Sequence, residues 1–120
     1  MFVKNLDDCS EITANDGCRL FEILHPEMDP VDLPYSVAVA RVEKNRCTYK
    51  HRLQQAEVYY ILTGAGKMHI DDEIHHIRQG DIIFIPPGSI QWLENHSNSE
   101  IKFIAIVSPP WMEKGDVRLD

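Results

Sequence analysis

The chain alternates short apolar segments with polar turns along most of its length. The segments are rich in valine, isoleucine, tyrosine and phenylalanine, and turn-forming residues separate them, which is typical of β-strands. The predicted strands are residues 18–24, 35–43, 47–52, 56–62, 67–70, 74–77, 82–85, 90–94 and 101–107. No segment of useful length repeats apolar residues at helical spacing. The pattern therefore predicts an all-β sandwich or barrel, and a jelly roll of two facing sheets is one such fold.

The segment from Tyr49 to Gly64, YKHRLQQAEVYYILTG, changes from alternating polar positions to a continuous apolar run. In an extended chain, every second side chain points to the same face. That face carries His51, Leu53, Gln55 and Glu57. The following run of β-branched and aromatic residues predicts a buried strand. A histidine and a carboxylate that lead into a buried strand predict a site inside the β-structure.

A second segment, Gly80 to Asn95, reads GDIIFIPPGSIQWLEN. A Gly-Asp turn, an apolar strand, a rigid Pro-Pro-Gly turn and a further strand follow one another. Together the two segments resemble the two motifs of the cupin superfamily. The first motif is matched at His51, Glu57 and Gly64, and the second at Gly80, Pro86, Gly88 and Asn95.

The resemblance implies a cupin jelly-roll β-barrel (a double-stranded β-helix) formed by one domain. We expect residues 1–17 to be an N-terminal arm, residues 18–111 the barrel and residues 112–120 an exposed, charged tail. The EVYYILTG, IPPG and SPPW segments are similar to those of small cupins called mannose-6-phosphate-isomerase-like. Exposed barrel edges and the arm predict strand-mediated pairing into a homodimer.

The motifs also depart from the family pattern at two metal-ligand positions. The usual cupin cage has three histidines and one glutamate, but Leu53 and Gln91 stand where two of the histidines belong. The resemblance implies a divalent metal cofactor (Zn, Fe, Ni or Mn), for which His51, Glu57 and Gln91 are the remaining ligands. Two alternatives stay open. One is a polar cluster with His51 hydrogen-bonded to Glu57 or Gln91, and the other is a metal-free site with His51 as base and Glu57 orienting its ring.

Other residues are predicted to bind a ligand. Tyr59 lies two positions beyond Glu57 and shares its inward face, while Arg41 and Tyr49 are expected within reach of the cavity. Tyrosine and arginine bind carboxylates, sugar hydroxyls or phosphates. Gln91 is a further candidate, and Trp111 in the SPPW segment is predicted to be a lid or packing residue at one end of the barrel.

Composition limits the partners. The 120 residues suit one domain, and the formal charge of −7 disfavours nucleic acids and anionic membranes. No apolar run approaches the roughly 20 residues of a membrane helix. Acidic residues in the opening MFVKNLDDCSE argue against a signal peptide, and an odd number of cysteines reads as reduced thiols, so we expect a cytoplasmic protein.

Two classes of function follow. The first is a module that binds a small polar molecule, such as a sugar or a carboxylate, in the barrel cavity. The second is an enzyme that uses His51 and Glu57, either a metal-dependent isomerase, lyase or dioxygenase, or a metal-free epimerase. The loss of two of the four expected ligands favours the binding module slightly.

Overall fold

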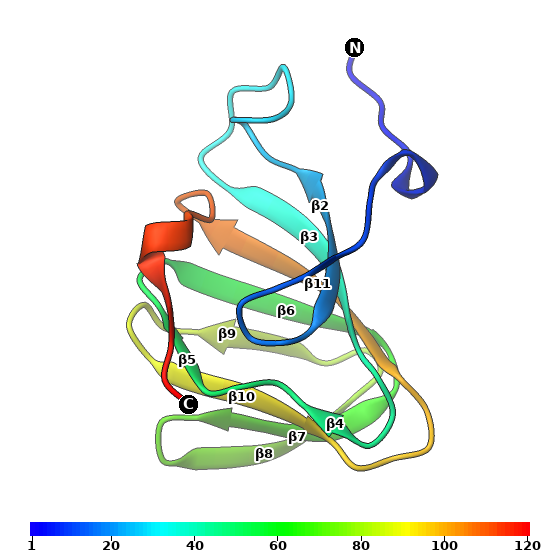
Figure 1. Ribbon diagram of the computed structural model, residues 1–120, viewed down its shortest axis with the longest axis vertical. Coiled ribbons are helices and arrows are strands. Elements are labelled where there is room, and N and C mark those ends of the chain that lie inside the picture. Colours follow the sequence, from blue (N-terminus) through cyan, green and yellow to red (C-terminus); the bar gives the residue numbers. More distant parts are fainter.

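The computed structural model describes all 120 residues, with twelve β-strands and two short 3₁₀ helices, η1 (Leu6–Asp8) and η2 (Glu113–Gly115) (Figure 1). The strands are β1 (Ile12–Thr13), β2 (Arg19–Leu24), β3 (Ser36–Val42), β4 (Arg46–Cys47), β5 (His51–Leu53), β6 (Ala56–Thr63), β7 (Ala65–Ile70), β8 (Glu73–Arg78), β9 (Ile82–Ile85), β10 (Ile90–Asn95), β11 (Ile101–Ser108) and β12 (Asp116–Arg118). No helix is long and apolar enough to cross a membrane.

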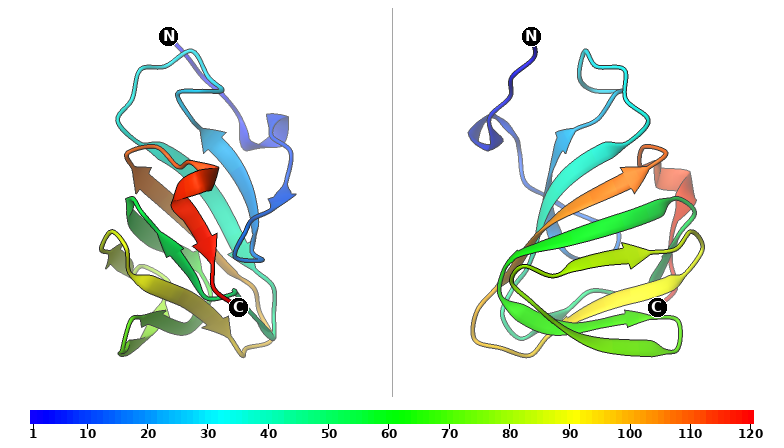
Figure 2. Two further views of the ribbon diagram at one scale, coloured as in Figure 1. Left: turned by 60° about the vertical axis from the view of Figure 1, so that its left-hand side comes forward. Right: turned by 180° about the vertical axis from the view of Figure 1, so that it is seen from behind.

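The strands form two antiparallel sheets that face each other (Figure 2). One sheet has the order β1-β2-β3-β11-β6-β9, and the other has the order β12-β5-β10-β7-β8, with β4 also paired to β10. In each sheet a late strand inserts between early ones, since β11 lies between β3 and β6 and β10 lies between β5 and β7. The predicted jelly-roll barrel is confirmed.

The predicted strands are confirmed closely, with one difference. The predicted strand 47–52 is two strands, β4 and β5, with Thr48 between them. Thr48 exchanges hydrogen bonds with Leu93, since its backbone N–H donates to the Leu93 carbonyl and its hydroxyl accepts from the Leu93 N–H. The side chain therefore replaces a regular ladder bond, and the chain stays attached to β10 across the break.

Period-two alternation places the core as expected. On β5 and β6 the buried side chains are His51, Leu53, Glu57, Tyr59 and Ile61, and Gln55 in the intervening turn is buried as well. On β3 the inward face has small residues at Ser36, Ala38 and Ala40. Larger residues such as Phe103, Leu93 and Ile101 fill the rest of the interior. The small residues of β3 leave space between the sheets.

Asn95 connects the end of β10 to the neighbouring turns. It is fully buried, and its amide nitrogen donates to the carbonyls of Val42 and Ser99, while its side-chain oxygen accepts from the Ser97 backbone. Its interpretation as a strand-end residue of the cupin motif agrees with this geometry. Gly64, between β6 and β7, has a φ of +92°, which a residue with a side chain adopts only with strain.

Both terminal segments contribute strands. The predicted arm ends in β1, which pairs with β2 of the same chain. The predicted exposed tail contains β12, which pairs with β5 and lies beside it in Figure 1. Most tail side chains are exposed, but Gly115 is buried and Asp116 is half-buried, so the expectation of an exposed tail is wrong at these positions.

Candidate functional site

A cavity of about 130 Å³ lies between the two sheets. Ala38 and Ala40 on β3, together with Leu53 on β5 and Phe103 on β11, form apolar walls. Trp111 also lines the cavity, which agrees with its predicted place at one end of the barrel. The Trp111 backbone is held from two sides, because its N–H donates to the Ser36 hydroxyl and its carbonyl lies 2.8 Å from His25 Nε2.

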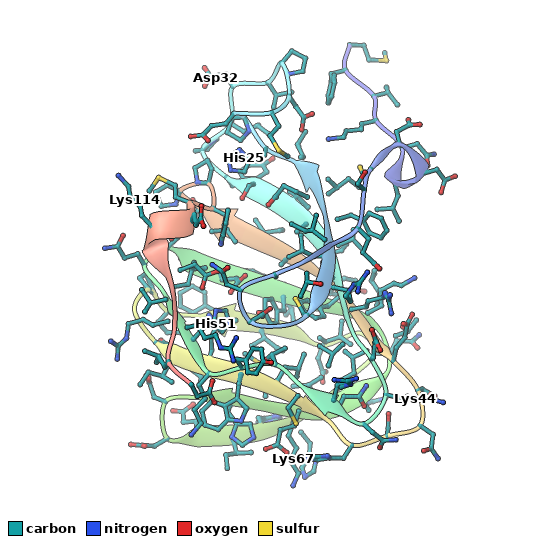
Figure 3. All side chains as sticks on the ribbon, in the orientation of Figure 1. His25, Asp32, Lys44, His51, Lys67 and Lys114 are labelled. Carbon is teal, nitrogen blue, oxygen red and sulfur yellow. The ribbon has the colours of Figure 1, made fainter.

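His51 is the centre of the polar part of the cavity. Its side chain is almost fully buried and lies in the interior in Figure 3. Its Nδ1 is 3.0 Å from Oδ1 of Asp116, and its Nε2 is 3.5 Å from Oδ2 of Asp16. Asp116 belongs to β12 and Asp16 to the turn between β1 and β2, so the two terminal segments supply the carboxylates around this ring.

Each carboxylate is itself held in place. Asp116 Oδ2 accepts a hydrogen bond from Trp111 Nε1 at 3.0 Å, and Asp16 Oδ1 accepts one from the Cys18 backbone N–H at 3.0 Å. In both residues the other oxygen faces His51. The imidazole is therefore oriented by Asp116, whereas one of the alternatives left open by the sequence had Glu57 or Gln91 as its hydrogen-bond partner. That expectation is wrong, because β12 brings a closer acceptor.

The surroundings of His51 change its basicity. Burial acts to lower its pKa, but the hydrogen bond to Asp116 and the negative charge of Asp16 outweigh burial, so the pKa is raised above the ordinary histidine value. With Nδ1–H donating to Asp116, Nε2 is the nitrogen that exchanges a proton with a ligand. His51 is thus a strengthened base on the wall of the cavity.

Glu57 supplies a second titratable group on the same wall. Burial, and then the nearby charges of Asp16 and Asp116, raise its pKa to about 8, although the charge of His51 and the nearby Gln91 amide counteract part of this rise. Its Oε1 is buried and has no hydrogen-bond partner in the chain. At neutral pH Glu57 is therefore a protonated carboxylic acid on the wall of the cavity.

Tyr59 and Gln91 form a pair beside this site. The Tyr59 hydroxyl donates to Gln91 Oε1 at 3.2 Å, and the Tyr59 ring packs against Phe103 with 4.3 Å between ring centroids. Tyr59 lines the cavity as predicted, whereas Gln91 does not. Gln91 is fully buried, and its Nε2 has no partner. Gln91 therefore holds the Tyr59 hydroxyl in place through this hydrogen bond. A role in ligand binding remains a prediction for both residues.

Two predicted site residues lie outside the cavity. Arg41 is on the outer face of β3, where its Nε is 2.8 Å from Glu11 Oε2, because the residues of β3 that point inward are the even-numbered ones. Tyr49 is 42% exposed, and the Arg118 guanidinium stacks 3.4 Å from its ring centroid. The expectation that Arg41 and Tyr49 reach the cavity is therefore wrong.

Three acidic residues of the cavity were missed. Asp16 and Asp116 belong to no cupin motif, and only their positions next to glycine, in turn-like segments, distinguish them in the sequence. Glu22 also lines the cavity, and burial raises its pKa. The alternation within 18–24 places Glu22 on the same face as Cys18 and Leu20, so this signal was available.

The donor set does not fit a tightly held metal ion. No three histidine, cysteine, aspartate or glutamate side chains are arranged as a metal site. Leu53 occupies one of the expected ligand positions and is almost fully buried. Gln91, at another of these positions, does not line the cavity and accepts a hydrogen bond from Tyr59. The predicted ligand set of His51, Glu57 and Gln91 is thus not supported, and we assign no chemical step to a metal.

Comparison with known proteins agrees with the fold. Residues 39–107 match the model of the cupin domain. An uncharacterised protein of Methanocaldococcus jannaschii is 32% identical over 106 residues, which cover 88% of this chain and 84% of that protein. An oxalate-binding protein of Thermotoga maritima is 34% identical over 59 residues, about half of each chain (49% and 48%).

Among solved structures, the nucleoside dehydratase Pac13 of Streptomyces superimposes with a TM-score of 0.77 at 16% identity, over 99% of this chain and 91% of that one. At this identity the likeness concerns the fold alone. The match of the domain model over more than half of the chain, and the relative that is 32% identical over most of it, establish the family. The chain belongs to the cupin family.

Proposed function

We propose that the barrel cavity binds a small molecule and moves a proton on it by metal-independent acid–base catalysis. One observation carries this proposal. The Asp116–His51 pair and the buried carboxyl of Glu57, whose Oε1 has no hydrogen-bond partner, line the same cavity. Two titratable groups whose surroundings assign them opposite roles are a recurring feature of acid–base sites. This arrangement favours the enzyme class over the binding module that the sequence favoured slightly.

His51 is the general base in this proposal. Asp116 holds the Nδ1–H, so the lone pair of Nε2 is available to take a proton from a ligand carbon next to an electron-withdrawing group. The imidazolium that forms is stabilised by Asp116, as the carboxylate of a catalytic triad stabilises its histidine. Asp116 acts through His51 and is therefore a positioning residue.

Glu57 is the general acid. In an elimination, His51 removes the proton from carbon, the new double bond forms, and Glu57 protonates the leaving hydroxyl as the C–O bond breaks, which releases water. His51 ends protonated and Glu57 ends ionised, and proton exchange through solvent restores both groups. In an isomerisation, His51 removes the proton from carbon and Glu57 protonates the carbonyl oxygen to give an enol. A proton then returns to carbon from the His51 imidazolium, and Glu57 takes back the proton of the enol oxygen as the carbonyl re-forms. The nucleoside dehydratase with the same barrel supports elimination as a reaction of this fold, by analogy only.

Deuterium exchange tests the proposal without a known substrate. The protein is incubated in D₂O near neutral pD with a panel of small β-hydroxy carbonyl compounds, and proton NMR follows exchange at carbon and formation of the alkene. We expect His51→Asn to abolish both reactions, since it removes the base. We expect Glu57→Gln to lower elimination by roughly 10²–10⁴-fold, the usual contribution of a general acid.

The matched control is Asp72→Asn, which changes an exposed carboxylate in the β7–β8 turn and should leave both rates unchanged. If no compound exchanges faster than in buffer, or if His51→Asn exchanges as fast as wild type, the acid–base proposal is wrong. If a compound binds in the cavity but shows no deuterium exchange at carbon, the protein is a binding module and not an enzyme of this kind.

A further inference from the structure

We infer that the ligand of this cavity carries a protonated amine on a short apolar body, and that Asp16 binds the amine. The inference names the ligand class for the site proposed above and so rests on the same cavity. It does not depend on any reaction taking place there.

Acidic side chains outnumber basic ones along the wall of the cavity. Four carboxyl side chains line it, those of Asp16, Glu22, Glu57 and Asp116. His51 is its one basic residue, and no lysine or arginine lines it. The labelled Lys44, Lys67 and Lys114 lie at the periphery in Figure 3. Two carboxylates, Asp16 and Asp116, lie beside His51, and even a fully protonated His51 balances the charge of only one of them. An anionic ligand would therefore be repelled by the remaining negative charge, and this repulsion is strong in a buried cavity of low dielectric constant.

Two acceptor oxygens in this cavity are left without a good partner. Asp116 uses both of its oxygens, for His51 and Trp111. Asp16 uses Oδ1 for the Cys18 N–H, but the 3.5 Å from its Oδ2 to His51 Nε2 is long for a hydrogen bond. Glu57 is 93% buried, since its exposed fraction is 7%, and its Oε1 has no hydrogen-bond partner. Although this carboxyl is protonated at neutral pH, its carbonyl oxygen can still accept a hydrogen bond. Unpaired buried acceptors call for a ligand with donors, and an ammonium group has three donors and no acceptor.

The apolar walls of the cavity indicate the size and character of the rest of the ligand. The cavity of about 130 Å³ is close to the roughly 150 Å³ that holds one benzene molecule in an apolar protein cavity. Ala38 and Ala40 leave this space, and Phe103 and Tyr59 present aromatic rings, which also attract cations. These dimensions suit an apolar body of roughly six to eight non-hydrogen atoms.

The inference replaces the expectation of a sugar or a carboxylate as the ligand. That expectation relied on Tyr59, which lines the cavity, and on Arg41 and Tyr49, which lie outside it. Oxalate, named for the Thermotoga maritima relative, has two negative charges, and the shared region covers only about half of each chain. We therefore expect this cavity to reject oxalate.

Three probes of matched shape test the ligand class: benzylamine, benzyl alcohol and benzoate. Binding is measured near pH 7 by NMR titration of the Ala38 and Ala105 methyl groups, which lie on the cavity wall. We expect benzylamine to bind at least about tenfold more tightly than benzyl alcohol, since a charge-assisted hydrogen bond contributes more than a neutral one. We expect benzoate and oxalate not to bind.

Asp16→Asn is the decisive variant, because asparagine keeps an oxygen for the Cys18 N–H and removes the charge. It should weaken benzylamine roughly tenfold or more and leave benzyl alcohol unchanged, whereas the surface control Asp72→Asn should change neither. Nuclear Overhauser contacts from wild-type Ala38 and Ala105 to the probe locate it even if Asp16→Asn fails to fold.

The inference is wrong if benzoate or oxalate binds as tightly as benzylamine, if a folded Asp16→Asn keeps the preference for the amine, or if no probe contacts the two alanines. The experiment measures binding alone. Amine binding without isotope exchange would therefore contradict only the proposed catalysis, and exchange without amine preference would contradict only this inference.

Discussion

Asp116 Oδ1 lies 3.0 Å from Nδ1 of His51 although 65 positions separate the two residues. The contact exists because β12 adds to β5 as the edge strand of its sheet, with Asp116 opposite Leu53. The Trp111 indole fixes the other oxygen of the same carboxylate. The last residues of the chain therefore determine how the histidine of the first cupin motif is oriented and charged.

The first prediction concerns Asp116→Asn. An amide in place of the carboxylate removes the negative charge that helps to raise the pKa of His51, so this pKa should fall, and the base should lose its orientation. NMR titration of the His51 ring measures the pKa, and the D₂O assay measures the rate, which should drop roughly 10²-fold or more. An unchanged pKa of His51 in a folded variant would show that Asp116 is not its electrostatic partner.

The second prediction concerns Glu57 and the pH dependence of stability. The pKa of Glu57 is about 8 in the folded protein, against an ordinary value of 4.5, so folding favours the protonated form. This contribution is fully present below about pH 4.5 and is lost as the pH rises toward about 8. His51 acts in the same direction, since its pKa is also raised and its contribution is lost as the pH passes that raised value. Wild type should therefore unfold more easily at pH 9 than at pH 6.

Glu57→Gln isolates the carboxyl, because glutamine stays neutral at every pH. The variant should lose less stability than wild type between pH 6 and pH 9, by an amount on the order of 2 kcal/mol, since each pKa unit corresponds to about 1.4 kcal/mol. Urea unfolding at the two pH values measures the difference. Parallel pH dependence in wild type and variant would mean that Glu57 is ionised in the folded protein at neutral pH.

The sequence predicted the barrel and one wall of the site but not the groups that complete it. Period-two alternation was sufficient to predict that His51, Glu57 and Tyr59 point inward, because successive side chains of a strand point to opposite faces. Asp116 reaches the site because β12 pairs with the distant β5, and Asp16 reaches it because the β1–β2 turn lies against the segment of Tyr49, whose N–H donates to the Asp16 carbonyl. Local pattern encodes neither contact. The prediction that Arg41 reaches the cavity considered only that arginine binds anions. It ignored the alternation along β3, where Ala38 and Ala40 point inward and Arg41 therefore points outward.

The third prediction concerns metal binding. Wild type should not take up near-stoichiometric Zn, Fe, Ni or Mn, because Leu53 and Gln91 do not supply the missing ligands. Changing both, as Leu53→His with Gln91→His, should create metal uptake, since Asp116 already orients the His51 ring as carboxylates orient metal-bound histidines. Elemental analysis of untagged protein and calorimetric titration give the stoichiometry. Stoichiometric metal in wild type that is lost in His51→Ala would contradict this prediction.

The fourth prediction concerns the homodimer, for which the sequence suggested strand pairing through the arm. The arm instead pairs within its own chain, and the outer face of the sheet that contains β6, β9 and β11 is apolar. Val58 on β6 lies between Ile106 and Phe84, and Tyr60 lies between Ile104 and Ile82, so two apolar rows cross three strands.

Four side chains of these rows are well exposed, with exposed fractions of 72% for Ile82, 62% for Phe84, 42% for Tyr60 and 37% for Ile106. Together they form a contiguous exposed apolar patch, and such patches often mark sites of protein–protein contact. Their partly buried neighbours extend the same face, so we expect a second copy of this chain to cover it.

Phe84→Glu should convert the dimer to a monomer, because pairing two copies of this face would then bury two carboxylates without partners. Ile74→Glu is the matched control, since Ile74 is also 62% exposed but lies on β8 of the other sheet. Light scattering after size-exclusion chromatography measures the mass of each. A monomeric wild type at micromolar concentration, or a dimer that survives Phe84→Glu, would show that the subunits do not pair through this face.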